Sequence, residues 1–342
     1  MKIKCLIWDL DGTLWEGVLN EGEIHIRPGV MEVVAELDRR GILQTIASHN
    51  DPEQAAVKLR ELELDKYFLH PQFNWGPKAE SIRRLVRRFG FALESMAFID
   101  DDPFQRFEAE RYFPGMHVYP AEEYEEILSR PEFQPDVITR ESGLRRRMML
   151  AEAERAKAGA SFAGPREDFL KSCEMKLTVR PGAGPDLDRI YELAARTTQL
   201  NNMPGLVDKS MVQAYLDGPK RAIYVAELTD RFGKYGIIGA ACLDIAENEA
   251  ETTLFCISCR IKGRGVAYVF LGETLGLLAK RHPRLERIHC RCRSDNRNRP
   301  ALLLLQMMGF KPGEKTTAHT CYVLPLPASY ARPAWLDVRI RA

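Results

Sequence analysis

Residues 3–13, Ile-Lys-Cys-Leu-Ile-Trp-Asp-Leu-Asp-Gly-Thr, decide the architecture of the first half of the chain. The apolar run from Ile3 to Trp8 indicates a short buried strand, and two aspartates follow where that strand ends. Further strands are predicted at 43–47 and 96–99, and helices at 30–40, 52–61 and 78–89. Strands that alternate with helices favour a parallel sheet covered on both faces, whose ligands bind beyond the carboxyl ends of the strands.

Length and charge indicate two domains of opposite character. At about 150 residues per domain, 342 residues suffice for two cores. The net charge is only +1, but residues 1–135 carry 16 basic and 25 acidic side chains, and the remainder carries 33 and 23. An acidic domain is therefore expected to precede a basic one, whose charge suits an anionic substrate or protein partner and requires no nucleic acid.

Composition excludes several other classes of protein. A content of 45% hydrophobic and 28% charged residues is ordinary for globular domains. No apolar run reaches the roughly 18 residues of a membrane helix, and the N-terminus lacks the features of a signal peptide. The eight cysteines are interpreted as reduced thiols, and the protein is expected to be cytoplasmic and not to bind a membrane.

The second half of the chain has a different order of elements. A charged, Ala-rich stretch with a Gly164-Pro165 break is interpreted as a helical linker. After it the pattern predicts an antiparallel α+β domain with a glycine loop and a helix at its centre. The predicted division is 1–137 for the first domain, 138–173 for the linker, 174–328 for the second domain and 329–342 for a C-terminal tail.

The strand ends of the first domain carry a set of polar residues suited to phosphoryl transfer. Asp9 and Asp11 end the first strand, Ser48 ends the second, Lys78 begins a helix, and Asp100-Asp101 end another strand. This order resembles the haloacid dehalogenase (HAD) superfamily of phosphoryl-transfer enzymes. Because fewer than 40 residues separate the first two motifs, the domain is expected to have only a minimal cap.

The HAD resemblance implies a role for each of these residues. Asp9 would attack phosphorus, and Asp11 would protonate the leaving oxygen and later activate water. Thr13, Ser48 and Lys78 would bind the phosphoryl group. Mg²⁺ prefers carboxylates and water, so Asp9, the carbonyl of Asp11 and one acid of the Asp100-Asp101 pair would hold it. The resemblance favours Asp101 as the direct ligand.

A second candidate site surrounds the glycine loop. Arg260, Gly263, Arg264 and Gly265 lie between a strand predicted at 252–260 and a helix at 266–281, where backbone N–H groups can bind a phosphate. The spacing and the element order resemble the pyrophosphate loop of GNAT acyltransferases. Cys259 precedes the loop between basic residues, which favours a thiolate nucleophile. His289, on the next predicted strand, is a candidate base for Cys259 or a structural histidine.

The whole chain resembles the FkbH-like family, the HAD-type glyceryl transferase/phosphatases of polyketide and tetronate pathways. The matching segments are WDLDGTLW (8–15), RPGV (27–30), GILQTIASHND (41–51), NWGPKAESI (74–82), FIDDDPFQR (98–106), RTTQLN (196–201), SCRIKGRGV (258–266) and NRPALLLLQMMGF (298–310). Gly12 and Thr198 stand where the family often has asparagine.

This resemblance implies a bifunctional enzyme that requires Mg²⁺. It would take the glyceryl group of 1,3-bisphosphoglycerate through Cys259, load it on the phosphopantetheine thiol of a holo acyl carrier protein, and remove the phosphate at Asp9. Thr197, Gln199 and Asn201 would form the acceptor pocket. Cys5 also matches a family cysteine but ranks behind Cys259, because it lies about 13 Å back from Asp9 on the buried strand.

Two alternatives remain open for the second domain. In the first, it is a conventional acyl-CoA N-acyltransferase whose glycine loop binds the CoA pyrophosphate, and Cys259 is only structural. In the second, it is a non-catalytic module that presents a carrier-bound phosphate to Asp9.

Overall fold

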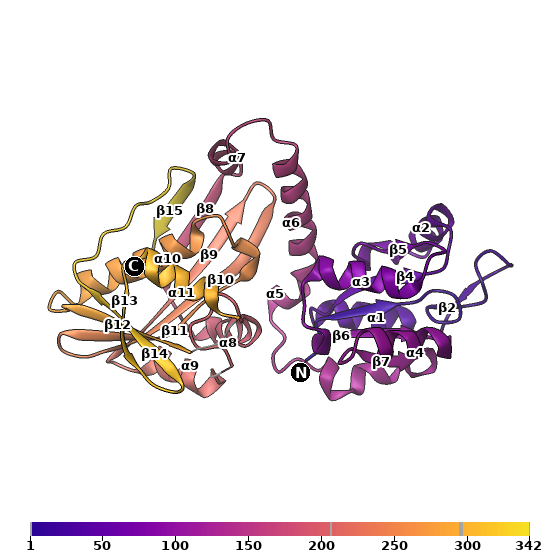
Figure 1. Cartoon of the computed structure of the whole chain (residues 1–342), viewed down its shortest axis with the longest axis horizontal. Coiled ribbons are helices and arrows are strands. Elements are labelled where there is room, and N and C mark those ends of the chain that lie inside the picture. Colours follow the sequence, from indigo (N-terminus) through magenta and orange to yellow (C-terminus); the bar gives the residue numbers. More distant parts are fainter. Residues whose placement is uncertain (1, 206, 294–296, 342) are drawn as a thin grey trace. The chain divides into compact units, whose positions relative to one another are not determined.

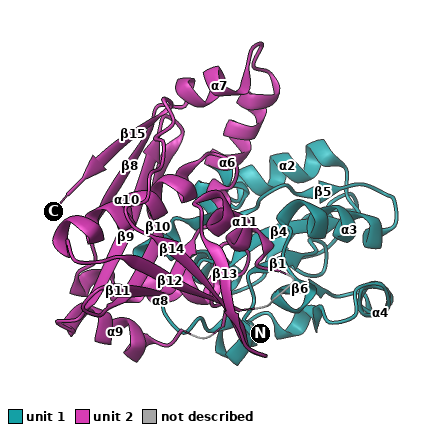
Figure 2. Cartoon of the chain, turned by 60° about the vertical axis from the view of Figure 1, so that its left-hand side comes forward, with its two compact units in different colours: residues 1–150 teal, residues 151–342 magenta. Residues whose placement is uncertain are grey.

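The computed structural model describes residues 2–205, 207–293 and 297–341, which form two compact units, residues 1–150 and 151–342 (Figure 2). Each unit has its own sheet and its own hydrophobic cores. The described part of the chain has no helix that is both long and apolar enough to cross a membrane.

Unit 1 is built on the predicted parallel sheet (Figure 1). In spatial order its strands are β5 (Gln72–Phe73), β4 (Leu43–Ser48), β1 (Cys5–Trp8), β6 (Met96–Asp100) and β7 (His117–Pro120). All neighbouring pairs run parallel. The central strand, β1, is fully buried, as its uninterrupted apolar run predicts.

Helices cover both faces of this sheet. They are α1 (Val30–Arg39), α2 (Pro52–Glu61), α3 (Lys78–Phe89), α4 (Pro103–Tyr112) and α5 (Arg140–Gly143). Alternation along β1 sends Leu6 and Trp8 into a core with α1 and α2, and Cys5 and Ile7 into a core with α3 and α4. The carboxyl ends of β1, β4 and β6 therefore lie between two layers of helices.

The segment between β1 and α1 contains only a short hairpin, formed by β2 (Trp15–Glu16) and β3 (His25–Ile26). The predicted minimal cap is confirmed in this respect, because no further element lies between Trp8 and Val30.

Unit 2 contains a sheet that is largely antiparallel. In spatial order its strands are β13 (Lys311–Lys315), β14 (His319–Pro325), β12 (Arg287–Arg293), β11 (Glu249–Ile257), β10 (Gly233–Ile245), β9 (Arg221–Asp230), β8 (Met175–Pro181) and β15 (Leu336–Ile340). The pairs β11–β12 and β8–β15 run parallel. This is the predicted α+β architecture.

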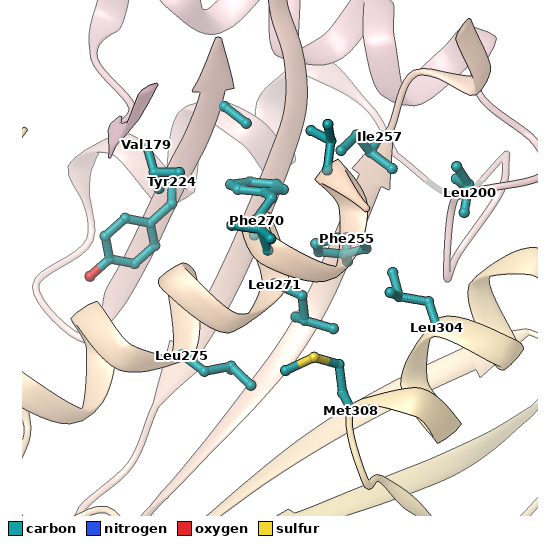
Figure 3. Packing of buried hydrophobic residues seen from close by; sticks show 14 of the residues in the cluster. Val179, Leu200, Tyr224, Phe255, Ile257, Phe270, Leu271, Leu275, Leu304 and Met308 are labelled. Carbon is teal, nitrogen blue, oxygen red and sulfur yellow. The ribbon is translucent and has the colours of Figure 1, made fainter. Parts of the chain in front are cut away.

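The helices of unit 2 pack on both faces of its sheet. They are α7 (Arg166–Ser172), α8 (Leu187–Arg196), α9 (Lys209–Asp217), α10 (Val266–Arg281) and α11 (Arg299–Met307), and α6 (Arg145–Ala160) connects the units. On one face α10 and α11 pack over a large core, and Figure 3 shows Phe270 of α10 beside Phe255 of β11, with ring centroids 5.5 Å apart. On the other face α8 and α9 enclose a smaller core.

Short 3-10 helices occupy several of the connections. They are η1 (Asp65–Tyr67), η2 (Leu93–Ser95), η3 (Ala121–Glu123), η4 (Glu126–Ser129), η5 (Pro131–Phe133), η6 (Gly184–Asp186) and η7 (Cys259–Ile261).

The domain boundaries differ from the predicted ones. The compact units divide within α6, so the predicted linker 138–173 belongs partly to each unit. The predicted tail 329–342 supplies β15, which pairs with β8 from Leu336 to Ile340, and Tyr330 contacts Gly272 of α10. Its backbone hydrogen bonds therefore make this segment an integral part of unit 2.

Phe270→Ala is expected to destabilise unit 2 by about 3–5 kcal/mol, because it removes a fully buried ring and leaves a cavity. Leu303→Ala on α11 is the matched control, since that leucine is 58% exposed and should change stability by less than about 0.5 kcal/mol. The stability of unit 2 in both variants is measured by urea titration, with the hydrogen exchange of peptides from β10 and β11 as the signal for its unfolding. Equal midpoints for the two variants would contradict this description of the core.

Candidate active site

A cavity of about 310 Å³ opens at the carboxyl ends of the parallel strands of unit 1. Its lining comprises Asp9, Asp11, Gly12, Gly17, Val18, Ser48, His49, Lys78, Asp100, Asp101, Asp102 and Gln105. The structure thus brings together the predicted residues of this site from three strands and from α3. Parallel strands end at the same edge of a sheet, which is why motifs about 90 residues apart meet here.

Lys78 holds two buried carboxylates together. Its Nζ lies 2.9 Å from Asp9 Oδ1 and 2.6 Å from Asp100 Oδ2. Burial raises the pKa of Asp9, although the charge of Lys78 lowers it, and burial and the charge of Asp9 raise the pKa of Asp100 to about 7. Burial lowers the pKa of Lys78, but the two carboxylates outweigh this effect and raise it. The single positive charge of Lys78 therefore faces two carboxylates. The charge left over on Asp9 and Asp100 favours the binding of a further cation.

Asp11 is fixed by three donors. Trp15 Nε1 donates to Asp11 Oδ1 at 2.7 Å, the Leu19 amide donates to the same oxygen at 3.1 Å, and Asn50 Nδ2 donates to Oδ2 at 2.9 Å. Asn50 also donates to Ser48 Oγ at 3.2 Å. Asn50 and Trp15 were not predicted as site residues. Asn50 could have been found from the sequence, because it follows Ser48 by two residues at the same strand end.

Thr13 lies among the carboxylates and is fully buried. Its hydroxyl is 3.4 Å from both Asp9 Oδ2 and Asp101 Oδ1, and it accepts the Asp101 amide N–H at 3.0 Å. The prediction that Thr13 binds phosphate is corrected by these contacts, because its hydroxyl positions Asp9 and Asp101.

Asp9, Asp100 and Asp101 form a cluster that fits a hard cation. Their carboxylates offer oxygen atoms that lie within 4.8 Å of one another, and in the described part of the chain no other group of His, Cys, Asp or Glu does so. Mg²⁺ binds such oxygen sets together with water. Among the described residues Lys78 alone bridges Asp9 and Asp100, so the oxygen atoms of the cluster and its net negative charge both fit the predicted metal.

The second predicted site is only partly assembled. Cys259 is exposed and begins η7, two residues beyond the end of β11, so it does not lie on the strand as predicted. Gly263 and Gly265 both have positive φ, 78° and 80°, which favours glycine at these positions. The loop therefore turns sharply into α10, whose first N–H groups have no intrahelical partner.

Arg264 does not face outward from the loop. It is 6% exposed, and its guanidinium contacts Glu152 of α6 and donates to the Arg260 carbonyl at 2.9 Å. Trp335 Nε1 in turn donates to the Arg264 carbonyl at 3.0 Å. The prediction that Arg264 binds a phosphate is corrected, because its charge anchors the loop to α6. Arg260 is half-buried, and its Nε donates to Ser258 Oγ at 3.1 Å.

His289 is not the base for Cys259. It pairs in register with Glu251 near the start of β11. Cys259 follows the other end of that strand, and that end, Ile257, is about 20 Å from Glu251 at ~3.3 Å per residue. The imidazole instead lies 3.7 Å from Cys321 Sγ and 3.2 Å from Glu249 Oε2. The cause is the register of β12, which pairs in parallel with the first residues of β11, so that His289 lies beside the start of β11 and not beside its end.

The segment predicted as the acceptor pocket fills a gap in the sheet. β11 and β12 pair only up to Thr252 and Cys290, and beyond that point Asn202 bridges them. Asn202 Oδ1 accepts the Phe255 amide at 2.7 Å, and its Nδ2 donates to the Arg291 carbonyl at 2.8 Å.

Asn201 is fully buried, and its amide donates to the carbonyls of Ala194 and Thr197. Asn201 is thus a structural residue, which corrects its predicted place in the acceptor pocket. Thr197 is also buried, and only Gln199 is exposed. Cys5 is buried in the core, and burial raises the pKa of its thiol, which does not suit a nucleophile.

The comparison with protein families supports the interpretation of unit 1. Residues 17–104 match the family model of haloacid dehalogenase-like hydrolase, described as a hydrolase. This match begins after Asp9 and Asp11, so the evidence for those two residues is the geometry described above. Among curated proteins, none is significantly similar to the chain.

Solved structures resemble parts of the chain. The N-terminal part of the protein BF1531 from Bacteroides fragilis, which contains a phosphatase domain complexed with Mg, is 28% identical over 37% of this chain and 39% of its own, with a TM-score of 0.33. The ribosomal-protein-S18-alanine N-acetyltransferase from Escherichia coli is 17% identical over 46% of this chain and 97% of its own, with a TM-score of 0.35. The GNAT domain of S. lividans PAT is 17% identical over 43% of this chain and 89% of its own, with a TM-score of 0.36.

The predicted fold class is confirmed. An HAD-like parallel-sheet hydrolase domain with a minimal cap is followed by an α+β domain with the strand–loop–helix order predicted for a GNAT-like fold. The chain is an enzyme.

Mg²⁺ is expected to stabilise the protein more at pH 8 than at pH 5.5. The pKa of Asp100 rises on folding from about 4 to about 7, so the folded chain favours the protonated carboxyl, and this contribution to stability is lost as the pH rises through 7. A bound cation compensates for the ionised form. Melting temperatures with EDTA and with Mg²⁺ at both pH values measure the effect. Asp100→Asn should reduce the pH dependence, and an equal Mg²⁺-induced shift at both pH values would contradict the prediction.

Proposed function

We propose that unit 1 is a Mg²⁺-dependent phosphatase that acts through an aspartyl-phosphate on Asp9. The single observation that carries this proposal is the cluster of Asp9, Asp11, Lys78 and Asp100 in one cavity. Phosphoryl transfer needs an in-line nucleophile, a proton donor for the leaving oxygen and positive charge near the transferred group, and these residues supply each of them.

The reaction divides into two displacements. Asp9 forms a bond to phosphorus while the bond to the leaving oxygen breaks, and Asp11 gives that oxygen a proton. Water then attacks the aspartyl-phosphate, Asp11 takes its proton, and phosphate leaves with Asp9 regenerated. Ser48 and Lys78 would hold the phosphoryl oxygens in both steps. Mg²⁺ held by Asp9, the Asp11 carbonyl and Asp101 or Asp100 would supply charge neutralisation.

We further propose that the chain is an FkbH-like glyceryltransferase/phosphatase. Unit 2 would transfer the glyceryl group of 1,3-bisphosphoglycerate through Cys259 to a holo acyl carrier protein, in the cytoplasm and without nucleic acid or membrane. Support comes from the exposed thiol of Cys259 directly before a loop that leads into a helix N-terminus. The basic composition of residues 136–342 suits an anionic substrate and an acidic carrier.

An acyl-CoA N-acyltransferase fused to the phosphatase is the second candidate. One observation favours it: among the described residues, no histidine or carboxylate hydrogen-bonds the Cys259 thiol to activate it. In this case the glycine loop would bind the CoA pyrophosphate, and Cys259 would have no chemical role.

Asp9→Asn is expected to lower hydrolysis of acetyl phosphate about 1,000-fold or more, because the nucleophile is lost while the side chain keeps its size. Phosphate release in the presence of Mg²⁺ measures it, with Asp51→Asn on the exposed start of α2 as the control. Unchanged hydrolysis by Asp9→Asn would refute the phosphatase proposal.

The transferase proposal is tested by intact-mass analysis of a holo carrier protein incubated with the enzyme, Mg²⁺ and 1,3-bisphosphoglycerate. The wild-type enzyme is expected to produce glyceryl carrier, and Asp9→Asn is expected to stop at the phosphoglyceryl thioester. Absence of any acyl adduct would refute the proposed transfer. A non-catalytic unit 2 would likewise give no thioester with Asp9→Asn.

Cys259→Ala separates covalent transfer from the alternative. Loss of glyceryl loading, with hydrolysis of acetyl phosphate retained, is the expected result, because the thiol is needed only for transfer. Cys321→Ala in the same unit is the matched control. Undiminished loading by Cys259→Ala would show that no thioester forms at this residue.

A further inference from the structure

A second cavity, of about 200 Å³, opens in unit 2 where β9 begins and where α9 and α10 end. Arg221, in its wall, is in register with Asp244, which is itself in register with Glu251 near the start of β11. Cys259 instead follows the other end of β11. The 16-residue helix α10 extends from the glycine loop to this cavity, a length of about 24 Å. No step of the reactions proposed above uses this cavity.

The charged side chains in the wall of this cavity are basic. Arg221, Arg281 and His282 line it, and no described aspartate or glutamate does. Arg221 is already paired, because its Nε donates to Asp244 Oδ1 at 3.2 Å. Within the described ranges no carboxylate pairs with Arg281, whose guanidinium lies 5.8 Å from the ring centroid of Tyr224. Arg281 therefore carries a positive charge that a bound anion can neutralise.

Tyr224, on β9, also lines the cavity, and its hydroxyl is an unused hydrogen-bond donor. The side chain is buried, and among the residues that the structure describes no acceptor reaches the hydroxyl. Figure 3 shows that this hydroxyl points away from Phe270. Burial raises the pKa of Tyr224, and the nearby charge of Arg281 lowers it in part. A buried hydroxyl without an acceptor costs free energy, so an oxygen atom bound in the cavity would stabilise it.

We propose that this cavity binds inorganic phosphate or the phosphate group of a small ester. Arg281 holds the anion through its guanidinium, the Tyr224 hydroxyl donates to one oxygen, and the imidazole N–H of His282 donates to another. These donors come from β9 and from the end of α10, and the tetrahedrally arranged oxygens of a phosphate can accept from them together. A carboxylate has only two oxygens, in one plane. The proposal does not rest on the phosphatase or the transferase proposed above.

The test follows hydrogen exchange in the full chain as orthophosphate is added, in EDTA so that Mg²⁺ recruits no phosphate to the Asp9 cavity. In the wild-type protein, peptides covering 219–224 and 278–284 are expected to become protected. Arg281→Gln should raise the phosphate concentration for half-maximal protection about tenfold, the effect of one hydrogen bond to a charged group. Arg284→Gln is the matched control and should keep the wild-type value, because this exposed arginine is outside the cavity wall.

Tyr224→Phe separates a binding role from a structural one. Without phosphate this variant should unfold at no lower urea concentration than the wild type, because it loses only an unsatisfied hydroxyl. Its protection should require about threefold more phosphate, the effect of one neutral hydrogen bond. Absence of protection in the wild type, or unchanged protection in both Arg281→Gln and Tyr224→Phe, overturns the proposal. An equal loss in Arg284→Gln also overturns it, because the attraction would then be nonspecific.

Two further anions identify the class of ligand. Tighter binding of n-propyl phosphate assigns the cavity to an ester, and tighter binding of orthophosphate assigns it to the free ion; both results support a phosphate site. Malonate carries two carboxylates and is expected to protect neither peptide at the same concentrations. Equal protection by malonate overturns the assignment to phosphate.

Discussion

The site in unit 1 depends on the buried ion pairs of Lys78 with Asp9 and Asp100. Lys78 is the first residue of α3, where the helix dipole disfavours a cation, and it is almost fully buried. Only the two carboxylates offset these costs, and removing one partner of a buried pair typically costs about 3–5 kcal/mol. These ion pairs therefore fix the position of α3 relative to β1 and β6. An apolar side chain at position 78 would avoid the cost of burying a charge, so the lysine is explained by the chemistry of the site.

The two units differ in what occupies the space beyond the ends of their strands. In unit 1 the five strands of the main sheet run parallel, and their carboxyl ends leave an open cavity lined by polar residues. In unit 2 the ends of β11 and β12 separate, but Asn202 satisfies backbone groups on both strands. A ligand that sought the same donors and acceptors would have to displace this segment.

The sequence was sufficient to predict that Asp9, Ser48, Lys78 and Asp100 converge, because each lies at a strand end or begins a helix in a parallel sheet, but it did not reveal the contacts of Asn50 and Trp15. Such positions converge whatever the exact strand order. The error at His289 has a different origin: its strand was predicted correctly as a neighbour of β11, but periodicity does not give register or direction. Thr13, Arg264 and Asn201 were of the right residue types for binding, yet their contacts are internal. Local sequence also gave no sign that Leu336–Ile340 pairs with β8, because that contact joins segments about 160 residues apart.

The hydrogen bonds of the aspartate pair bear on which acid would hold the metal directly. Both oxygens of Asp100 are engaged, Oδ2 by Lys78 at 2.6 Å and Oδ1 by the Asp102 amide at 2.9 Å. Asp101 is exposed, and within the described ranges its carboxylate accepts a hydrogen bond only from the Thr13 hydroxyl, at 3.4 Å. A cation displaces a weak neutral contact more readily than a buried ion pair. The geometry therefore favours Asp101 as the direct ligand, with Asp100 keeping Lys78 in place.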